Sequence, residues 1–382
     1  MNETSEITLL RESIVNNIQY VHSQISPKTE LCSVVKGNAY GHGIETFVPM
    51  MLAGGVKAFA VYSTDEAMRV KAILPPGCRL IVMGDADELA INWLIEEDVE
   101  FYVFTFHRLK NAVKASIELG KKARVHIELE TGMYRTGFDE SDLPELAEIM
   151  SSSREYIHFA GLCTHFAGAE LLENLDRVNT QAEKFKSGLQ YFREQKLYPQ
   201  IVHACCSAAM MRMPKMHFDL VRVGIMLYGF WPSREMSIEY AALHPEKPNP
   251  LKRVIRWKSR IMSIKDVPAG AWVGYGETFA ARTNMKIAVV PVGYAHGYAR
   301  SLSNYGQVLV KGIKLPVLGV VNMNCMSIDV TLIKDLEIND EVVLIGNQKD
   351  EELSVASFSE RSEQLNYELL TRLPHSIPRK ED

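Results

Sequence analysis

Short apolar runs rich in β-branched residues recur between Leu31 and Tyr228, and each is followed by a polar turn and a longer helical pattern. Such alternation is typical of repeated strand–helix units with a parallel sheet. The predicted strands are Leu31–Val35, Ala58–Tyr62, Leu80–Met83, Phe101–Phe104, Ala123–Leu129, His158–Thr164, Ile201–Ala204 and Phe218–Val223. Predicted helices between them include Glu66–Leu74, His107–Leu119 and Thr180–Gln195.

Eight strand–helix units in about 200 residues predict an α/β fold, a (β/α)8 TIM barrel. A doubly wound sheet would alternate in the same way. It usually carries a G-x-G-x-x-G turn after its first strand, however, and this chain has none there. The pattern therefore favours the barrel.

The alternation stops at a proline-punctuated stretch from Trp231 to Pro250, which is typical of a connector between domains. Beyond it lie short alternating segments: Val254–Ile264, Lys286–Val292, Gln307–Lys311, Ile328–Val330 and Glu341–Ile345. We expect two domains, a barrel over residues 1–240 and a mainly-β domain over residues 241–382.

Composition and charge narrow the classes of partner. The 382 residues include 42 basic and 47 acidic side chains, a net charge of −5, so no cationic field favours nucleic acid. The polar start and the absence of an apolar run near ~18 residues predict a cytoplasmic protein without a membrane span. Six scattered cysteines without C-x-x-C or clustered histidines predict no structural metal.

Candidate chemistry begins where the first predicted strand ends, since a barrel places its functional groups at the carboxyl ends of its strands. Lys36 follows that strand directly, and a glycine-rich turn from Gly37 to Gly43 leads into a helix at Ile44. Such a path can bring backbone N–H groups and the Tyr40 hydroxyl near an anion. The residues alone leave open a solvated lysine followed by an ordinary turn.

The run from Val35 to Gly43 closely resembles the lysine motif of the alanine racemase family, and further motifs follow in the family's order. These are residues 131–137 (TGMYRTG), 164–167 (THFA), 221–229 (VRVGIMLYG), 273–279 (VGYGETF), 292–300 (VGYAHGYAR) and 366–368 (NYE). The resemblance covers nearly the whole chain. It implies a TIM barrel followed by a β domain, and a head-to-tail homodimer with shared active sites.

The resemblance also implies that the chain interconverts L- and D-alanine with pyridoxal 5'-phosphate (PLP), and supplies D-alanine for peptidoglycan. Lys36 would form a Schiff base with PLP and act on one face of the substrate, while Tyr275 of the neighbouring chain acts on the other. The remaining implied roles are His165 and Arg222 toward the cofactor ring, Tyr40, Ser207, Gly224, Ile225 and Tyr367 toward its phosphate, and Arg135 with the Met323 backbone toward the substrate carboxylate. Taken singly, His165 could be a core histidine and Arg222 a barrel salt-bridge residue.

Several positions depart from the family's usual residues. They are Gly37 for Ala, Cys206 and Gly274 for Asn and Ser, Asn322 and Asn324 for Cys and Asp, and His296 for Asp. Glu128 stands where many members carry a lysine modified to a carbamate. We hypothesise that its carboxylate holds Arg135 directly.

Three other functions stay open. A serine or broad-specificity racemase would use the same two bases, but Tyr367 favours a small side chain because serine-active relatives tend to lose this tyrosine. A non-catalytic PLP-binding protein would share the barrel and the lysine, but normally lacks the β domain. A metal-dependent barrel hydrolase would need His-x-His or paired carboxylates at strand ends.

Overall fold

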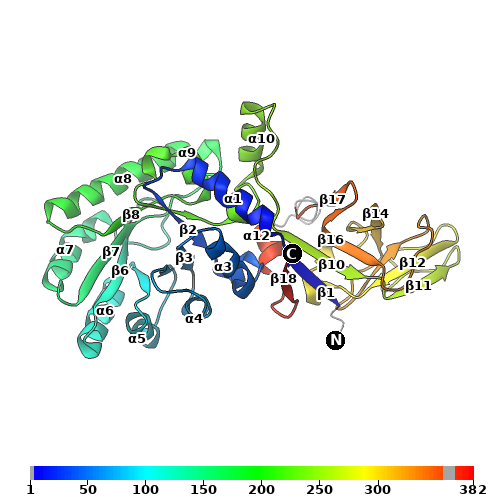
Figure 1. Ribbon diagram of the computed structural model, residues 1–382, viewed down its shortest axis with the longest axis horizontal. Helices are drawn as coiled ribbons and strands as arrows, with labels where there is room; N and C mark the ends of the chain where they lie inside the picture. The colour runs from blue at the N-terminus through cyan, green and yellow to red at the C-terminus, as the bar shows by residue number, and fades with distance from the viewer. Residues whose placement is uncertain (1–3, 356–365) are drawn as a thin grey trace. The chain divides into compact units, whose positions relative to one another are not determined.

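A computed structural model describes residues 4–355 and 366–382 of the chain. The chain forms two compact units (Figure 1). The barrel unit comprises Glu12–Gly37 and Val48–Arg253, and the β unit comprises Met1–Arg11, Asn38–Phe47 and Val254–Asp382. The β unit thus includes the N-terminal strand and the segment that follows the lysine, which the sequence pattern did not indicate.

The barrel unit contains eight parallel strands, which confirms the predicted TIM barrel. They are β2 (Glu30–Val34), β3 (Ala58–Val61), β4 (Arg79–Val82), β5 (Glu100–Val103), β6 (Ala123–Glu128), β7 (Ile157–Cys163), β8 (Ile201–His203) and β9 (Leu220–Val223). The order is β8-β7-β6-β5-β4-β3-β2-β9. Each lies within two residues of a predicted strand at both ends because buried apolar runs mark them clearly.

Two seams involving β9 nearly close the barrel. On one side β9 pairs with β2 in parallel, with Cys32 opposite Arg222. On the other side the Asp219 N–H donates to the Val202 carbonyl at 3.1 Å, and the Arg222 N–H donates to the Cys205 carbonyl at 2.9 Å. These bonds bring the ends of β8, β9 and β2 together.

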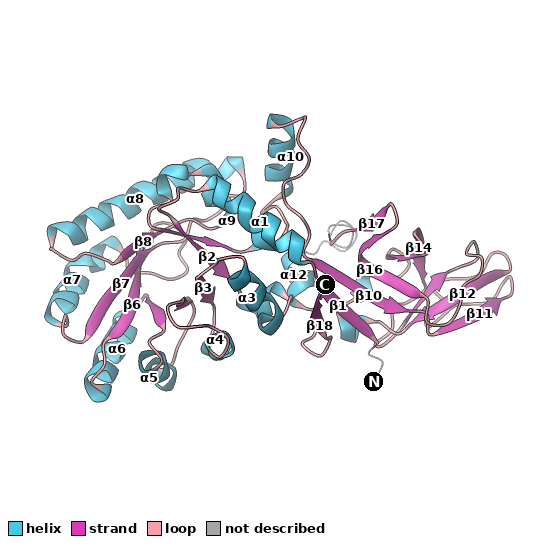
Figure 2. Cartoon of the chain, viewed as in Figure 1, coloured by secondary structure: helices cyan, strands magenta, loops and turns pink. Residues whose placement is uncertain are grey.

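Amphipathic helices surround the strands (Figure 2). They are α1 (Arg11–Gln24), α3 (Ile44–Ala53), α4 (Thr64–Lys71), α5 (Glu88–Glu96), α6 (Phe106–Leu119), α7 (Leu143–Ser152), α8 (Leu175–Glu194) and α9 (Ser207–Arg212), with 3-10 turns at Glu140–Asp142, Leu172–Asn174 and Pro214–Met216. Helix α6 shows why they begin and end where they do. The Thr105 hydroxyl accepts from the Arg108 N–H at its start, and Gly120 ends it with φ of 61°.

The proline-punctuated connector contains a helix, α10 (Arg234–Leu243), that the sequence analysis did not predict. The Ser233 hydroxyl accepts from the Met236 N–H at 3.1 Å and caps its first turn. The Tyr240 ring packs on Trp231 and Tyr20, with centroids 5.1 and 6.3 Å away. Capping and aromatic packing therefore stabilise a helix between the prolines.

The β unit is built on a mainly antiparallel sheet, as predicted. Its strands are β1 (Ser5–Leu9), β10 (Ile255–Arg260), β11 (Ser263–Val267), β12 (Met285–Val290), β13 (Gln307–Val310), β14 (Ile313–Leu318), β15 (Met326–Asp329), β16 (Glu341–Gln348), β17 (Glu351–Leu353) and β18 (Arg379–Glu381). The order is β11-β12-β15-β14-β13-β16-β10-β1-β18, with β17 beside β16. Helix α12 (Asn366–Thr371) and 3-10 turns at Tyr294–His296 and Arg300–Leu302 complete the described unit. Trp257 and Tyr298 are fully buried in it.

No helix among the described residues combines the length and the apolar character that a membrane crossing requires.

Asn17 of α1 ties the end of the barrel unit's chain to its first helix. The side chain is fully buried. Its amide nitrogen donates to the carbonyls of Leu227 and Lys252 at 3.3 and 2.7 Å, and its oxygen accepts from the Lys252 N–H at 2.8 Å. A buried asparagine with all these bonds made is stabilising, whereas its loss leaves buried backbone groups unpaired.

We predict that Asn17→Leu, of similar volume, lowers the free energy of unfolding by about 2–4 kcal/mol, because it leaves the Lys252 N–H and C=O without partners. Denaturant unfolding measures the change. Gln19→Ala, at an exposed position of the same helix, is the matched control and should stay within about 0.5 kcal/mol. Equal stability of the Asn17 and Gln19 variants would show that these bonds contribute nothing.

Candidate active site

Lys36 stands at the carboxyl end of β2 and opens the short turn α2 (Lys36–Tyr40). Four consecutive residues of this turn, from Gly37 to Tyr40, have φ between 50° and 62°. This is left-handed backbone, which costs about 1–2 kcal/mol for each residue with a side chain. Gly37 begins the turn without that cost. The Asn38 side chain accepts from the Ile44 N–H at 3.2 Å and helps to hold the turn.

Positive groups gather around Lys36 in the barrel unit. Burial lowers the pKa of Lys36, and the positive charges of Arg135 and Arg222 lower it further. The negative charge of Glu66 partly opposes this shift. Burial, with the charges of Arg222, Arg135 and Lys36, lowers the pKa of His165 to about 3. The structure therefore brings together four residues that the sequence resemblance singled out, and their combined charge favours anionic ligands.

Arg222, near the end of β9, is held by four hydrogen bonds. One terminal nitrogen donates to His203 Nδ1 and to the His203 carbonyl, and the other donates to the carbonyls of Thr164 and Ala204. These bonds use all four terminal hydrogens of the guanidinium. The remaining donor, Nε–H, has no partner among the described residues and is left for a ligand.

The next residues after β9 form a compact turn with the start of α9. The Gly224 N–H donates to the Ser207 hydroxyl at 3.0 Å, and both residues are buried. Ser207 is the first residue of α9, and Ile225 opens the 3-10 turn Ile225–Tyr228. The first turns of helices present free backbone N–H groups, which suit a phosphate.

The hypothesis that Glu128 holds Arg135 directly is wrong. The Glu128 carboxylate accepts from the Thr136 hydroxyl at 2.8 Å, and no ion pair joins it to Arg135 in the described part of the chain. Burial raises the pKa of Glu128 although the Thr136 bond and the charges of Arg222 and Arg135 oppose this. Glu130 instead orders the loop before Arg135, since it accepts the N–H groups of Met133 and Arg135 at 2.7 and 3.3 Å.

In the β unit, Tyr275 lies at the tip of a tight loop. Its side chain is 75% exposed. The flanking Gly274 and Gly276 have φ of 76° and 75°, and Glu277 has φ of 50°. Gly274, which departs from the family's usual serine, thus suits a left-handed position. The loop presents the tyrosine to its surroundings and not to the core of its own unit.

Met323 lies on a second exposed loop of the β unit. Its carbonyl accepts from the Ala295 N–H at 2.9 Å, and the neighbouring Asn322 carbonyl accepts from the Tyr294 N–H at 3.0 Å. None of the hydrogen bonds described for this loop uses the Met323 N–H. That donor is available to a carboxylate, as the sequence resemblance implies.

Tyr40 and Tyr367 come together within the β unit although they are 327 positions apart in the sequence. Their rings meet edge to face with centroids 6.1 Å apart. The pair therefore brings two phenol groups from distant segments to one place.

Three buried polar residues inside the barrel were missed as candidates by the sequence analysis: Glu100, His126 and His203. Each interrupts an apolar strand, Glu100 at the start of β5, His126 within β6 and His203 at the end of β8. A polar residue within a strand that is buried on both faces was the available signal.

Comparison with known families and proteins gives consistent matches. The family described as "Alanine racemase, N-terminal domain" matches residues 11–232, and "Alanine racemase, C-terminal domain" matches residues 254–381. An alanine racemase of Leptospira interrogans is 34% identical, with 98% of this chain and 95% of the relative covered. One of Methanococcus maripaludis is also 34% identical, with 96% and 95% covered.

Solved structures agree over the full length. Alanine racemase from Bacillus anthracis with bound L-Ala-P superposes with a TM-score of 0.90 at 30% identity, covering 100% of this chain and 96% of that one. Alanine racemase from Bartonella henselae with covalently bound pyridoxal phosphate superposes with a TM-score of 0.85 at 28% identity, covering 100% of both. The chain therefore belongs to the alanine racemase family.

Proposed function

We propose that this chain is a PLP-dependent alanine racemase that interconverts L- and D-alanine with two bases, Lys36 and Tyr275. One observation carries the proposal above the others: Lys36 and Arg222 lie at the carboxyl ends of paired strands, β2 and β9, within a cationic cluster. The family match over both units supports it. Supply of D-alanine for peptidoglycan is the role that we propose for the product.

The residues fit PLP. Ser207 and the backbone of Gly224 and Ile225 would hold the phosphate, together with the hydroxyl groups of Tyr40 and Tyr367. The unpartnered Arg222 Nε–H would donate to the ring nitrogen, which a guanidinium cannot protonate because it does not release its proton in proteins. Lys36 would hold the cofactor covalently. When bound, PLP withdraws electrons from the substrate's Cα and makes its hydrogen acidic.

Racemisation needs a proton carrier on each face of Cα. The lowered pKa of Lys36 gives this amine a larger neutral fraction at physiological pH than an exposed lysine, so it can accept as well as donate. Tyr275 of the partner subunit would serve the opposite face. Its loop position, exposed from its own unit, supports this assignment.

His165 acts as a neutral link in this proposal. With a pKa of about 3 it carries no proton charge near pH 7, and it can accept or donate one hydrogen bond at each ring nitrogen. It would accept from or donate to the Tyr275 hydroxyl while Arg222 lies beyond it. Because His165 is neutral, it adds no further positive charge beside Lys36.

Arg135 and the Met323 N–H would bind the substrate carboxylate, since both are donors on exposed loops. The two phenols Tyr275 and Tyr367 would crowd the side chain and favour the methyl group of alanine over serine. We also propose a homodimer with shared active sites. The exposed Tyr275 and Met323 of the β unit support it. A cytoplasmic location fits six free cysteines, which a reducing compartment maintains.

We predict that the purified holoenzyme converts L-alanine to D-alanine, and that Lys36→Ala and Tyr275→Phe each lower the rate by about 10²–10⁴-fold because each removes one proton carrier. Circular dichroism of the alanine solution follows the conversion, with serine and larger amino acids as a substrate panel.

Tyr198→Phe, at an exposed tyrosine before β8, is the matched control and should keep the full rate. A yellow protein that racemises nothing would point to a non-catalytic PLP-binding protein. Serine turned over as fast as alanine would favour the broad-specificity racemase.

We predict that acid destabilises the cofactor-free protein partly through His165. Its folded pKa lies below that of an unfolded histidine, near ~6.5, so the unfolded state binds the proton first as the pH falls. The stability that this residue contributes is present above about pH 6.5 and is lost toward pH 3. Between pH 7 and pH 5, wild type should lose about 1–2 kcal/mol more than His165→Gln. Parallel stability curves measured by urea unfolding over this range would contradict the neutral histidine.

A further inference from the structure

A line of buried polar groups crosses the interior of the barrel from β5 to β9. His126 Nε2 lies 2.8 Å from the Glu100 carboxylate, and His126 Nδ1 lies 2.8 Å from His203 Nε2. His203 Nδ1 is hydrogen-bonded in turn to Arg222. The exposed fraction of each of the four side chains is 4% or less. The line therefore runs without solvent from a carboxylate to the guanidinium of the candidate site.

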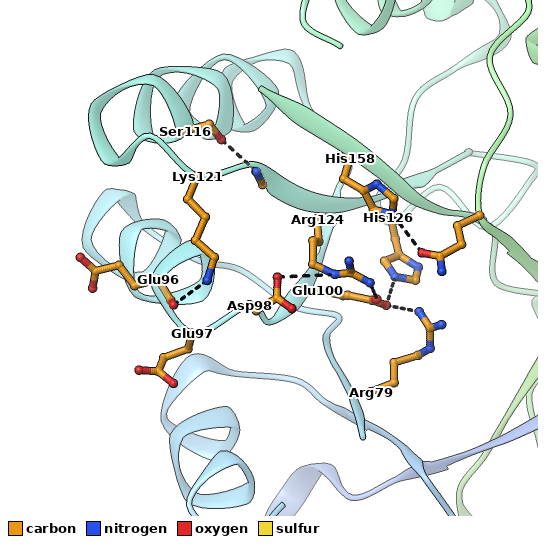
Figure 3. Close-up of polar contacts among 12 residues, drawn as sticks. Arg79, Glu96, Glu97, Asp98, Glu100, Ser116, Lys121, Arg124, His126 and His158 are labelled. Carbon is orange, nitrogen blue, oxygen red and sulfur yellow. Dashed lines mark hydrogen bonds and ion pairs between the residues drawn. The ribbon is translucent and has the colours of Figure 1, made fainter. Parts of the chain in front are cut away.

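The carboxylate end is strongly ionised. Glu100 pairs with Arg79 at 2.5 Å and with Arg124 at 2.6 Å, and Figure 3 shows both arginines converging on it beside His126. Burial alone would raise the pKa of Glu100. The interaction with His126, the charge of Arg79 and the hydrogen bond from Arg124 outweigh burial and hold the pKa well below its usual range. Glu100 is consequently an acceptor only.

Glu100 can only accept at one end of the line and Arg222 can only donate at the other, and this determines which ring nitrogens between them carry protons. Glu100 must accept from Nε2–H of His126, which leaves Nδ1 of the neutral ring bare. That bare nitrogen must accept from Nε2–H of His203, which leaves Nδ1 of His203 bare. The bare Nδ1 accepts from Arg222, which is always a donor. One arrangement of protons satisfies all three bonds.

Protonation of either imidazole would break this order. A second proton on His126 would face the Nε2–H of His203, and a second proton on His203 would face the N–H of Arg222. Burial lowers the pKa of His126, with the Glu100 bond only partly opposing it, and burial with the charge of Arg222 holds the pKa of His203 well below its usual value. Both rings are therefore neutral.

The surroundings fix the rings in place. A Cβ atom at Gly161 of β7 would lie 2.2 Å from His126 Nδ1, so only glycine leaves room for this imidazole. The Tyr102 ring stacks on His126 with centroids 5.9 Å apart. Arg222 itself makes no ion pair with a carboxylate in the described ranges. Its terminal nitrogens depend on His203 and three backbone carbonyls for their orientation.

We propose that Glu100, His126 and His203 are positioning residues, whose single order of protons gives Arg222 a fixed acceptor and so aims its Nε–H at the cofactor ring. The inference rests on the proposed PLP function for its chemistry. The order of protons itself depends only on the barrel. It can therefore be tested apart from racemisation.

The first test is nitrogen NMR of histidine-labelled protein at pH 7–8, with and without PLP. We expect both His126 and His203 to be protonated at Nε2 and bare at Nδ1. The ring signals that disappear in His126→Gln and His126→Leu are those of His126, which assigns the two rings. A protonated Nδ1 on His203, or an average of two tautomers there, would overturn the proposal even if the enzyme is fully active.

The second test compares two replacements of His126, which does not touch Arg222. In His126→Gln the amide can still donate to Glu100 and accept from His203, whereas His126→Leu can do neither. We expect His126→Leu to lower kcat for alanine about 10–100-fold with a smaller change in KM, since small misplacements of a site are costly. It should also shift the absorption band of bound PLP. If His126→Leu lowers kcat about 100-fold, the kcat of His126→Gln should be at least about tenfold higher than that of His126→Leu.

Unfolding measurements on both variants separate positioning from stability. Equal kcat and equal cofactor spectra in two folded variants would contradict the proposal. If wild type binds PLP but racemises no alanine, the proposed function is wrong, but this result does not contradict the positioning of Arg222. The NMR result and the shift of the PLP band by His126→Leu then still decide whether these residues position Arg222.

Discussion

The parallel pairing of β9 with β2 is the constraint on which the candidate site depends. It sets Cys32 opposite Arg222, and so places Lys36, four residues farther along, at the same rim of the barrel as Arg222. The bond from the Arg222 N–H to the Cys205 carbonyl fixes the other side of β9 beside the end of β8. Residues from the first and last strands of the barrel thereby meet, and the turn after β9 adds Gly224 and Ile225 next to Ser207.

That closure carries an electrostatic consequence. It puts a permanent guanidinium charge inside the barrel close to Lys36 and Arg135, where burial is costly unless the charge is hydrogen-bonded. The carbonyls of Thr164 and Ala204 and the neutral imidazole of His203 accept hydrogen bonds from this guanidinium. His165 is uncharged as well. Burial lowers the pKa of Lys36, and the positive charges of Arg135 and Arg222 lower it further, so the same arrangement of charges also affects the expected chemistry of the amine.

Much of this architecture could be predicted from the sequence, because buried strands are apolar and the turns between them are polar. Lys36, His165 and Arg222 could be identified because they follow or end such strands within recognisable motifs. The pairing of β1 with β10 could not, since it joins residues about 250 positions apart. Nor could the line from Glu100 to His203, because side chains on different strands meet only through the register of the closed barrel. The expected contact of Glu128 with Arg135 failed because a nearer hydroxyl, that of Thr136, satisfies the carboxylate.

Transfer of the Cα hydrogen tests the central claim of two proton carriers most directly. L-alanine is incubated with the holoenzyme in deuterium oxide, and both enantiomers are followed early in the reaction by NMR after chiral derivatisation. Two carriers predict D-alanine that carries solvent deuterium at Cα, while the unconverted L-alanine still keeps its original hydrogen. D-alanine that retains the substrate's hydrogen would show a single base acting on both faces, and would contradict the assignment of Lys36 and Tyr275 to opposite sides.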